Sequence, residues 1–123
     1  MLPPGPARRV TIHLNEDTSA SHDFLYKEIF SLLYERGVAG ASLIRPQAGF
    51  GFHHRLHQSE GENAAGEHLP VRIEFVDTRE MVDSLLPALF LLITDGLIEA
   101  QDTTILKSVA GAVAGAEPSA EPT

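Results

Sequence analysis

The sequence predicts an α+β domain in which two helices pack on one face of an antiparallel sheet. Two segments alternate apolar and polar residues as strands do, and each precedes a segment whose apolar residues recur at helical spacing. These two strand–helix units lie at about residues 8–36 and 70–92, with a long connection between them. Because 123 residues provide one domain's worth of core, we expect both units to share a single sheet.

The first unit combines a strand at about residues 8–14 with a helix at about residues 21–36. The apolar face of the strand is formed by Val10, Ile12 and Leu14. The apolar stripe of the helix is formed by Leu25, Ile29, Leu32 and Leu33. Gly37 follows at the position where a glycine commonly ends a helix. We therefore expect a half-buried strand and an amphipathic helix that share one core.

The next β-prone segment, "GASLIRPQA", contains Pro46, which has no N–H group to donate to a neighbouring strand. This strand is therefore expected at an edge of the sheet or with a bulge. The connection that follows, "GFGFHHRLHQSEGENAAGEH", is roughly twenty residues long and has no lasting period. Connections of this length are usually functional or mobile, so it is a candidate site.

The second unit starts with the alternating run "PVRIEFVD", whose apolar face is formed by Val71, Ile73 and Phe75. Asp77 is expected to cap the following helix, with Glu80 completing a capping box, and Pro87 is expected to kink it. After "TDG", the runs "LIEA" and "TTILK" predict one or two short strands. The order is β-α-β-β-α-β, the ferredoxin-like arrangement, in which right-handed crossovers place both helices on one face.

Both ends of the chain are expected to be disordered tails around one folded domain at residues 8–108. Residues 1–7 and 109–123 are rich in proline, glycine and alanine and show neither helical nor strand periodicity.

The formal net charge of -8 argues against nucleic-acid binding, which needs a basic surface to displace counterions. There is no apolar run near 18 residues, so we expect no insertion into a membrane.

The absence of cysteine excludes disulfides and thiolate nucleophiles or metal ligands, and it is consistent with a cytoplasmic protein. No "GxSxG" nucleophile motif is present, and the neighbouring acids Asp77 and Glu80 are better explained as a helix cap. We therefore do not expect an enzyme. A small-molecule active site assembled at a subunit interface remains the alternative, because one chain's sequence would not reveal it.

One region lacks acidic residues: no Asp or Glu occurs among the 24 residues between Glu35 and Glu60. This region holds three of the nine basic residues and three of the six histidines. Glycines let backbone N–H groups approach an anion, and nearby basic side chains add charge. The candidate ligands for a small anion are Arg45, Gly49, Gly51, His53, His54 and Arg55.

A metal site is the alternative for the same region. His53, His54 and His57 have spacings that would place pairs of them on one face of a helical turn, and neutral imidazole binds zinc, copper or nickel. No carboxylate lies closer than Glu60 to supply a fourth ligand, and "HHxxH" lacks the glutamate of a zinc protease motif. A solvated histidine-rich loop and a divalent metal site both remain open.

Four runs together resemble the family called domain of unknown function 190, which is grouped with the PII-like (GlnB-like) proteins: "RVTIHLNE", "LLYERGVAGASLIRPQAGFGFHHRLHQ", "LPVRIEFVDT" and "ITDGLIEAQDTTILK". The resemblance covers about residues 8–108 and implies a ferredoxin-like fold assembled as a compact homotrimer. It also implies a signalling role, with ligands such as adenine nucleotides bound in clefts between subunits. The long loop at about residues 52–68 would then dock onto a protein partner, such as a transporter or an enzyme. No nucleotide-binding signature carries over residue by residue, so nucleotide binding rests on analogy of fold.

Overall fold

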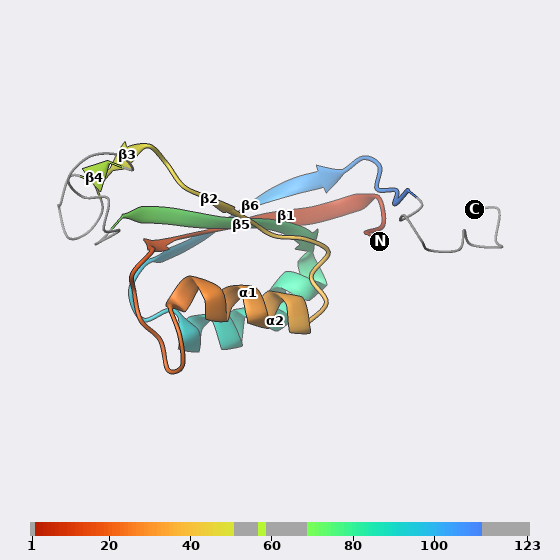
Figure 1. Ribbon diagram of the computed structural model, residues 1–123. Coiled ribbons are helices and arrows are strands. Elements are labelled where there is room, and N and C mark those ends of the chain that lie inside the picture. The colour runs from red at the N-terminus through yellow and green to blue at the C-terminus, as the bar shows by residue number, and fades with distance from the viewer. Residues whose placement is uncertain (1, 51–56, 59–68, 112–123) are drawn as a thin grey trace.

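The computed structural model describes residues 2–50, 57–58 and 69–111 of the chain. Along the chain the elements are β1 (Gly5–Asn15), α1 (Leu25–Glu35), β2 (Ser42–Ile44), β3 (Ala48–Gly49), β4 (His57–Gln58), β5 (Pro70–Thr78), α2 (Arg79–Leu92) and β6 (Leu97–Ile105) (Figure 1). Neither helix is both long enough and apolar enough to cross a membrane, within the residues that the structure describes.

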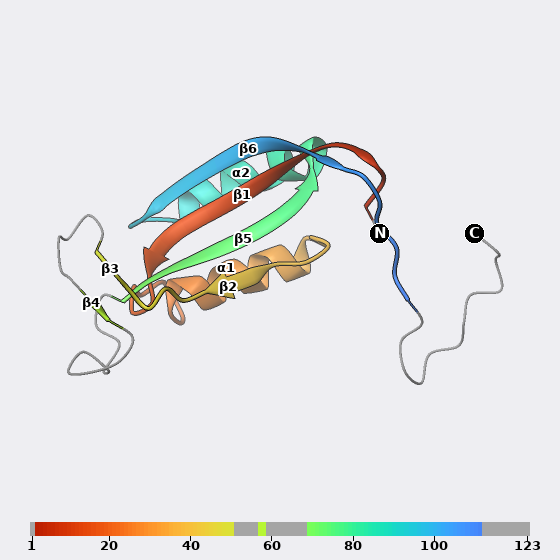
Figure 2. The ribbon, with the colours of Figure 1, turned by 90° about the horizontal axis from the view of Figure 1, so that it is seen from above.

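Four of the strands form one antiparallel sheet in the order β2-β5-β1-β6, as the view from above shows (Figure 2). Both helices lie on one face of this sheet, and no described element covers the other face (Figure 1). The predicted α+β, ferredoxin-like fold is therefore confirmed. The strands β3 and β4 add a separate two-stranded ladder at the base of the long connection, and the runs "LIEA" and "TTILK" belong to one strand, β6.

The core lies between the helices and the sheet and contains the apolar residues that the periodicity selects. The strands contribute Val10, Ile12, Leu14, Val71, Ile73 and Phe75, and the helices contribute Leu25, Ile29, Leu33, Val82, Leu85 and Leu89. Each of these residues is at most 5% exposed. Their burial is the main favourable contribution to folding, at about 1.5–3 kcal/mol for each large side chain. Among the described strands, the short strand β2 pairs with β5 alone, so the predicted edge position is also confirmed.

The C-terminus of α1 is closed by a glycine in the left-handed region, as expected. Gly37 has φ 83°, its N–H donates to Tyr34 O at 3.1 Å, and the N–H of Val38 donates to Leu33 O at 3.1 Å. These two bonds form a Schellman motif, which satisfies carbonyl groups at the end of the helix. The chain therefore turns sharply after α1 and returns to the sheet as β2.

The N-terminus of α2 is capped by Thr78, and the prediction that Asp77 is the cap is wrong. The side chain of Thr78 accepts a hydrogen bond from the Met81 N–H at 3.2 Å. Asp77 lies one residue earlier, at the end of β5, and its carboxylate is buried. The alternation of β5 directs the Asp77 side chain towards the helices, where it accepts other hydrogen bonds described below.

Replacing Thr78 by alanine should lower the free energy of unfolding by about 1 kcal/mol, the usual contribution of an N-cap hydroxyl. The physical reason is that the Met81 N–H loses its acceptor at the first turn of α2. Urea denaturation followed by circular dichroism measures the change. Thr78→Ser keeps the hydroxyl oxygen and should retain most of the stability; an equal loss in both variants would contradict the assignment of the cap.

β1 begins at Gly5, three residues before the expected start of the domain at residue 8. Residues 5–7 pair with Thr103–Ile105 of β6, and Ala7 is fully buried. β5 ends opposite Ala7, so among the described strands Pro6 has only β6 as a partner and lies at an edge of the sheet, where proline is tolerated. The composition of these residues is typical of a tail. It does not reveal the strand, because the partner strand lies about a hundred residues away in the sequence. Residues 112–123 of the expected C-terminal tail lie outside the described residues.

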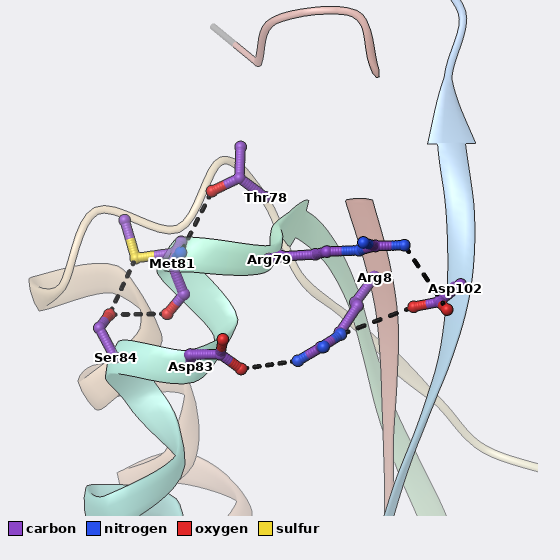
Figure 3. A network of polar contacts seen from close by, with 7 residues as sticks. All are labelled: Arg8, Thr78, Arg79, Met81, Asp83, Ser84 and Asp102. Atoms are coloured by element: carbon purple, nitrogen blue, oxygen red, sulfur yellow. Dashed lines mark hydrogen bonds and ion pairs between the residues drawn. The ribbon is translucent and has the colours of Figure 1, made fainter. Parts of the chain in front are cut away.

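A cluster of charged side chains joins β1, α2 and β6 on the helix side of the sheet (Figure 3). Arg8 Nη1 lies 2.6 Å from Asp83 Oδ1, and Arg8 Nε lies 3.6 Å from Asp102 Oδ1. Arg79 Nη2 also lies 3.6 Å from Asp102 Oδ2. Because these side chains are exposed to solvent, each pair contributes at most about 1 kcal/mol. We interpret the cluster as a set of ion pairs that links β1, α2 and β6.

Candidate functional site

A pocket of about 400 Å³ lies at the start of the edge strand β2, and we call it the edge pocket. It is lined by Arg9, Gly40, Ala41, Ser42, Glu74, Phe75 and Val76. The register of the sheet brings these residues together, since Ser42 pairs with Glu74 and Arg9 pairs with Val76. The side chains at these four positions lie on the uncovered face, because their neighbours Val10, Leu43 and Phe75 pack into the core. One side of the pocket is open because β2 has no further strand beside it among the described elements.

The charges of the edge pocket suit a small polar ligand with an anionic group. The guanidinium of Arg9 has no ion-pair partner among the described residues, and it is exposed. Glu74 accepts from Arg72 Nε at 3.0 Å, which leaves capacity on the carboxylate for a further donor. Ser42 adds a hydroxyl that both donates and accepts. A Cβ atom at Gly40 would find no atom within 4 Å, so its backbone is accessible to a ligand.

The uncovered face of the sheet continues this polar surface beyond the edge pocket. His13 Nε2 lies 2.8 Å from Glu99 Oε2, and Thr11 pairs with Glu74 on one side and Glu99 on the other. Thr11, His13, Arg72 and Glu74 therefore make this face polar. A polar face without a covering layer meets either water or another protein surface.

The base of the long connection forms a second charged region beyond the end of β2. Arg45 Nε forms an ion pair with Glu16 Oε1, and Glu16 also donates its backbone N–H to Leu69 O at 2.8 Å. Glu16 therefore links the two ends of the connection to the end of β1. An anion that binds Arg45 has to compete with this carboxylate.

The structure places part of the predicted anion site at this base. Gly49 lies in β3, and a Cβ atom there would lie 3.2 Å from Pro70 Cγ, so the glycine packs closely against the start of β5. Gly51, His53, His54 and Arg55 lie outside the described residues. The backbone of His57 pairs with Gly49 in the β3–β4 ladder. The predicted ligand set around Arg45 therefore stays a prediction.

The metal hypothesis also stays a prediction from the sequence, since His53 and His54 lie outside the described residues. Within the part of the chain that the structure does describe, no group of three or more His, Cys, Asp or Glu could hold a metal ion. The edge pocket contains none of the six residues predicted as anion ligands, so it defines a separate candidate site and does not test either hypothesis.

Sequence reasoning missed Arg9 and Ser42 as candidate site residues. The alternation of β1 and β5 places Arg9 and Glu74 on the uncovered face, but it does not show that β2 brings Ser42 opposite Glu74. Two signals were present in the sequence: a basic residue on the polar face of a strand, and the small-residue run "AGAS" before β2. Only the strand register joins them.

Comparison with known proteins supports the fold and identifies the family. Residues 7–105 match the model of the family DUF190, described as "Uncharacterized ACR, COG1993". The UPF0166 protein MJ1524 of Methanocaldococcus jannaschii is 30% identical over 102 residues, which are 82% of this chain and 93% of that protein.

Two solved structures show the same fold at low sequence identity. CPII of Thiomonas intermedia K12, a nitrogen regulatory PII-like protein bound to ADP, AMP and bicarbonate, is 19% identical with a TM-score of 0.57 over 87% of this chain and 100% of that chain. A PII-like signalling protein of Thermus thermophilus is 16% identical with a TM-score of 0.61 over 86% of this chain and 94% of that chain. The chain therefore belongs to the DUF190 family, and its fold is the ferredoxin-like fold of PII-like proteins.

Proposed function

We propose that this protein is a PII-like regulator that binds an adenine nucleotide in the edge pocket. The observation that carries the proposal is the guanidinium of Arg9, which has no ion-pair partner among the described residues and lies beside Ser42 and Glu74 in a pocket of about 400 Å³. Arg9 is suited to the phosphate groups, because guanidinium forms bidentate bonds with phosphate. Glu74 and Ser42 offer hydrogen bonds to the amino and hydroxyl groups of a nucleoside. The binding of ADP and AMP by CPII, which has the same fold, supports this choice of ligand.

The open side of the edge pocket supports a site completed by a neighbouring subunit. The polar face of the sheet lacks a covering layer in the described chain, and a homotrimer would bury part of it. Each copy would then supply its Arg9, Ser42 and Glu74 to one cleft. Ligand clefts between subunits protect a bound nucleotide from solvent and make its affinity depend on assembly.

Arg45 provides a second cation beyond the far end of β2. It directly follows β2 and lies three residues after Ser42, which corresponds to about 10 Å at about 3.3 Å per strand residue, and this odd spacing directs the two side chains to opposite faces. A contact between the nucleotide and Arg45 requires that the ligand displace Glu16 and that the Arg45 side chain turn to the uncovered face. We propose that this contact transmits the ligand state to the long loop at about residues 52–68, which would contact a protein partner such as a transporter or an enzyme. We assign no catalytic group to the site.

The test is calorimetric titration of the full chain with ADP, preceded by a thermal-shift screen with AMP, ADP, ATP and cyclic nucleotides. A ligand that binds the folded state raises the melting temperature. Arg9→Ala should weaken ADP binding tenfold or more, since a charge-assisted hydrogen bond contributes about 1.5–3 kcal/mol and about 1.4 kcal/mol corresponds to tenfold. Arg45→Ala should weaken it less, because its charge is already paired with Glu16.

Arg79→Ala is the matched control, since it removes the same charge on the helix side of the sheet, where Arg79 pairs with Asp102. Its ADP affinity should equal that of the wild type. A flat screen with correctly folded protein would refute the proposed function, and equal losses in Arg9→Ala and Arg79→Ala would refute the location of the site.

A further inference from the structure

Asp77 is the one buried charged residue among those that the structure describes, with 3% of its surface exposed. It lies at the end of β5 on the face that packs against the helices, directly after the pocket residues Phe75 and Val76. A buried carboxylate is unfavourable unless hydrogen bonds replace its lost hydration. Asp77 does not cap α2, since Thr78 does so, and the apolar core offers no partner for a carboxylate. Its hydrogen bonds must therefore explain why it is buried.

The carboxylate accepts hydrogen bonds from two backbone N–H groups. Oδ1 accepts from Thr78 N at 2.8 Å, and Oδ2 accepts from Ala39 N at 3.2 Å. The bond to Thr78 is local, but the bond to Ala39 joins residues 38 positions apart in the sequence. The carboxylate of Asp77 therefore ties the segment after α1 to the end of β5.

The segment that Asp77 holds is the wall of the edge pocket. The N–H groups of Gly37 and Val38 bond back to α1, and Ser42 enters the ladder with β5. Residues 39–41 lie between these two anchors. Among the described residues, the hydrogen bond that ties this segment to a distant part of the chain is the one from Ala39 N to Asp77. Gly40 and Ala41 follow Ala39 directly and line the edge pocket together with Arg9 and Glu74. Gly40 and Ala41 also line an apolar pocket of about 320 Å³ next to α1.

We infer that Asp77 is a positioning residue for the edge pocket. By holding the Ala39 N–H, it sets where Gly40, Ala41 and the Ser42 hydroxyl lie relative to Arg9 and Glu74. It acts through the backbone and does not itself contact the ligand, because its side chain lies on the opposite face of β5. The inference rests on the proposed function, since it predicts the ligand affinity of the same pocket.

The experiment compares Asp77→Ala, Asp77→Asn and Thr78→Ala in the full chain at one protein concentration, well below all melting temperatures. Calorimetry measures ADP affinity, and hydrogen exchange measures protection of the Ala39 amide. Asp77→Ala should weaken ADP binding about tenfold and expose the Ala39 amide, because the loss of a bond to a charged group is about that large. Asp77→Asn keeps one oxygen that can accept a hydrogen bond from the Ala39 N–H. It should therefore recover part of the ADP affinity and part of the protection of the Ala39 amide.

Thr78→Ala is the matched control, because it destabilises the same junction without touching residue 39. Its ADP affinity should remain within about twofold of the wild type, a free-energy difference below about 0.5 kcal/mol. A purely structural carboxylate would instead lower the melting temperature of Asp77→Ala and leave its ADP affinity unchanged, as for Thr78→Ala, because both variants are fully folded at the temperature of the measurement. If Asp77→Ala does not fold, the same two measurements are made on Asp77→Asn.

The outcomes separate the inference from the proposed function. If the wild type does not bind ADP or another nucleotide, the proposed function fails and the inference fails with it. If the wild type binds ADP and a folded variant of residue 77 binds equally well while its Ala39 amide exchanges freely, only the inference fails. Unchanged protection of Ala39 in Asp77→Ala would also overturn it. Affinity that falls together with Ala39 protection supports it.

Discussion

Leu85→Ala should lower the free energy of unfolding by about 2–5 kcal/mol, the range for removing a large buried aliphatic side chain. Leu85 is fully buried at the centre of the α2 face that packs on the sheet. The variant loses the transfer free energy of the removed methyl and methylene groups and leaves a cavity between α2 and the sheet. Urea denaturation measures the loss, at a fixed protein concentration so that any assembly contributes equally.

Leu91→Ala is the matched control, because it makes the same substitution on the same helix at a residue that is 84% exposed. Its effect should stay within about 0.5 kcal/mol, the usual range for a surface position. Equal effects at the two positions would mean that α2 does not pack through the face that contains Leu85. A loss at Leu91 alone would point to a partner surface on the outer side of α2.

Gly96→Ala should have the second large effect on stability. Gly96 lies in the turn between α2 and β6 with φ 143°, where other residues pay about 1–3 kcal/mol in backbone strain. A Cβ atom there would also lie 2.4 Å from the carbonyl oxygen of His13. That atom belongs to the backbone of β1 beside the first pair of the β1–β6 ladder, so it cannot move aside without disturbing the sheet. We expect a lower midpoint in urea and weaker pairing at the start of β6.

Gly111→Ala is the control for this substitution, since a Cβ atom at Gly111 has no atom within 4 Å and its backbone is not in the left-handed region. Its stability should equal that of the wild type or rise slightly, because alanine restricts the unfolded chain. Equal losses in Gly96→Ala and Gly111→Ala would contradict the geometry of the α2–β6 turn.

The pattern of apolar residues was sufficient to predict the strands and helices of the core. Ile12 and Ile73 alternate with polar neighbours, and Ile29 and Leu89 recur at helical spacing, so their burial follows from local geometry. Gly37 was predicted for the same reason, because ending a helix in the left-handed region is a local requirement. These features depend on residues within a few positions of one another.

The errors arose where a distant segment decided the structure. Asp77 has the sequence context of a helix cap, but the Ala39 N–H and burial against the helices give it another role, and Thr78 caps α2 instead. Pro6 lies in a composition typical of a tail, but β6 supplies a partner strand for it. In both cases the competing interaction joins residues at least 38 positions apart.

By itself, the sequence determined the α+β class, the order of the main elements, the core residues and the acid-free region that contains Arg45. The tertiary structure alone decided that Arg9, Ser42 and Glu74 surround one pocket, that Glu16 pairs with Arg45, and that Asp77 holds the pocket wall. The physical reason is that periodicity specifies which face of an element is buried. Strand register specifies which residues of different elements meet, and register depends on the whole sheet.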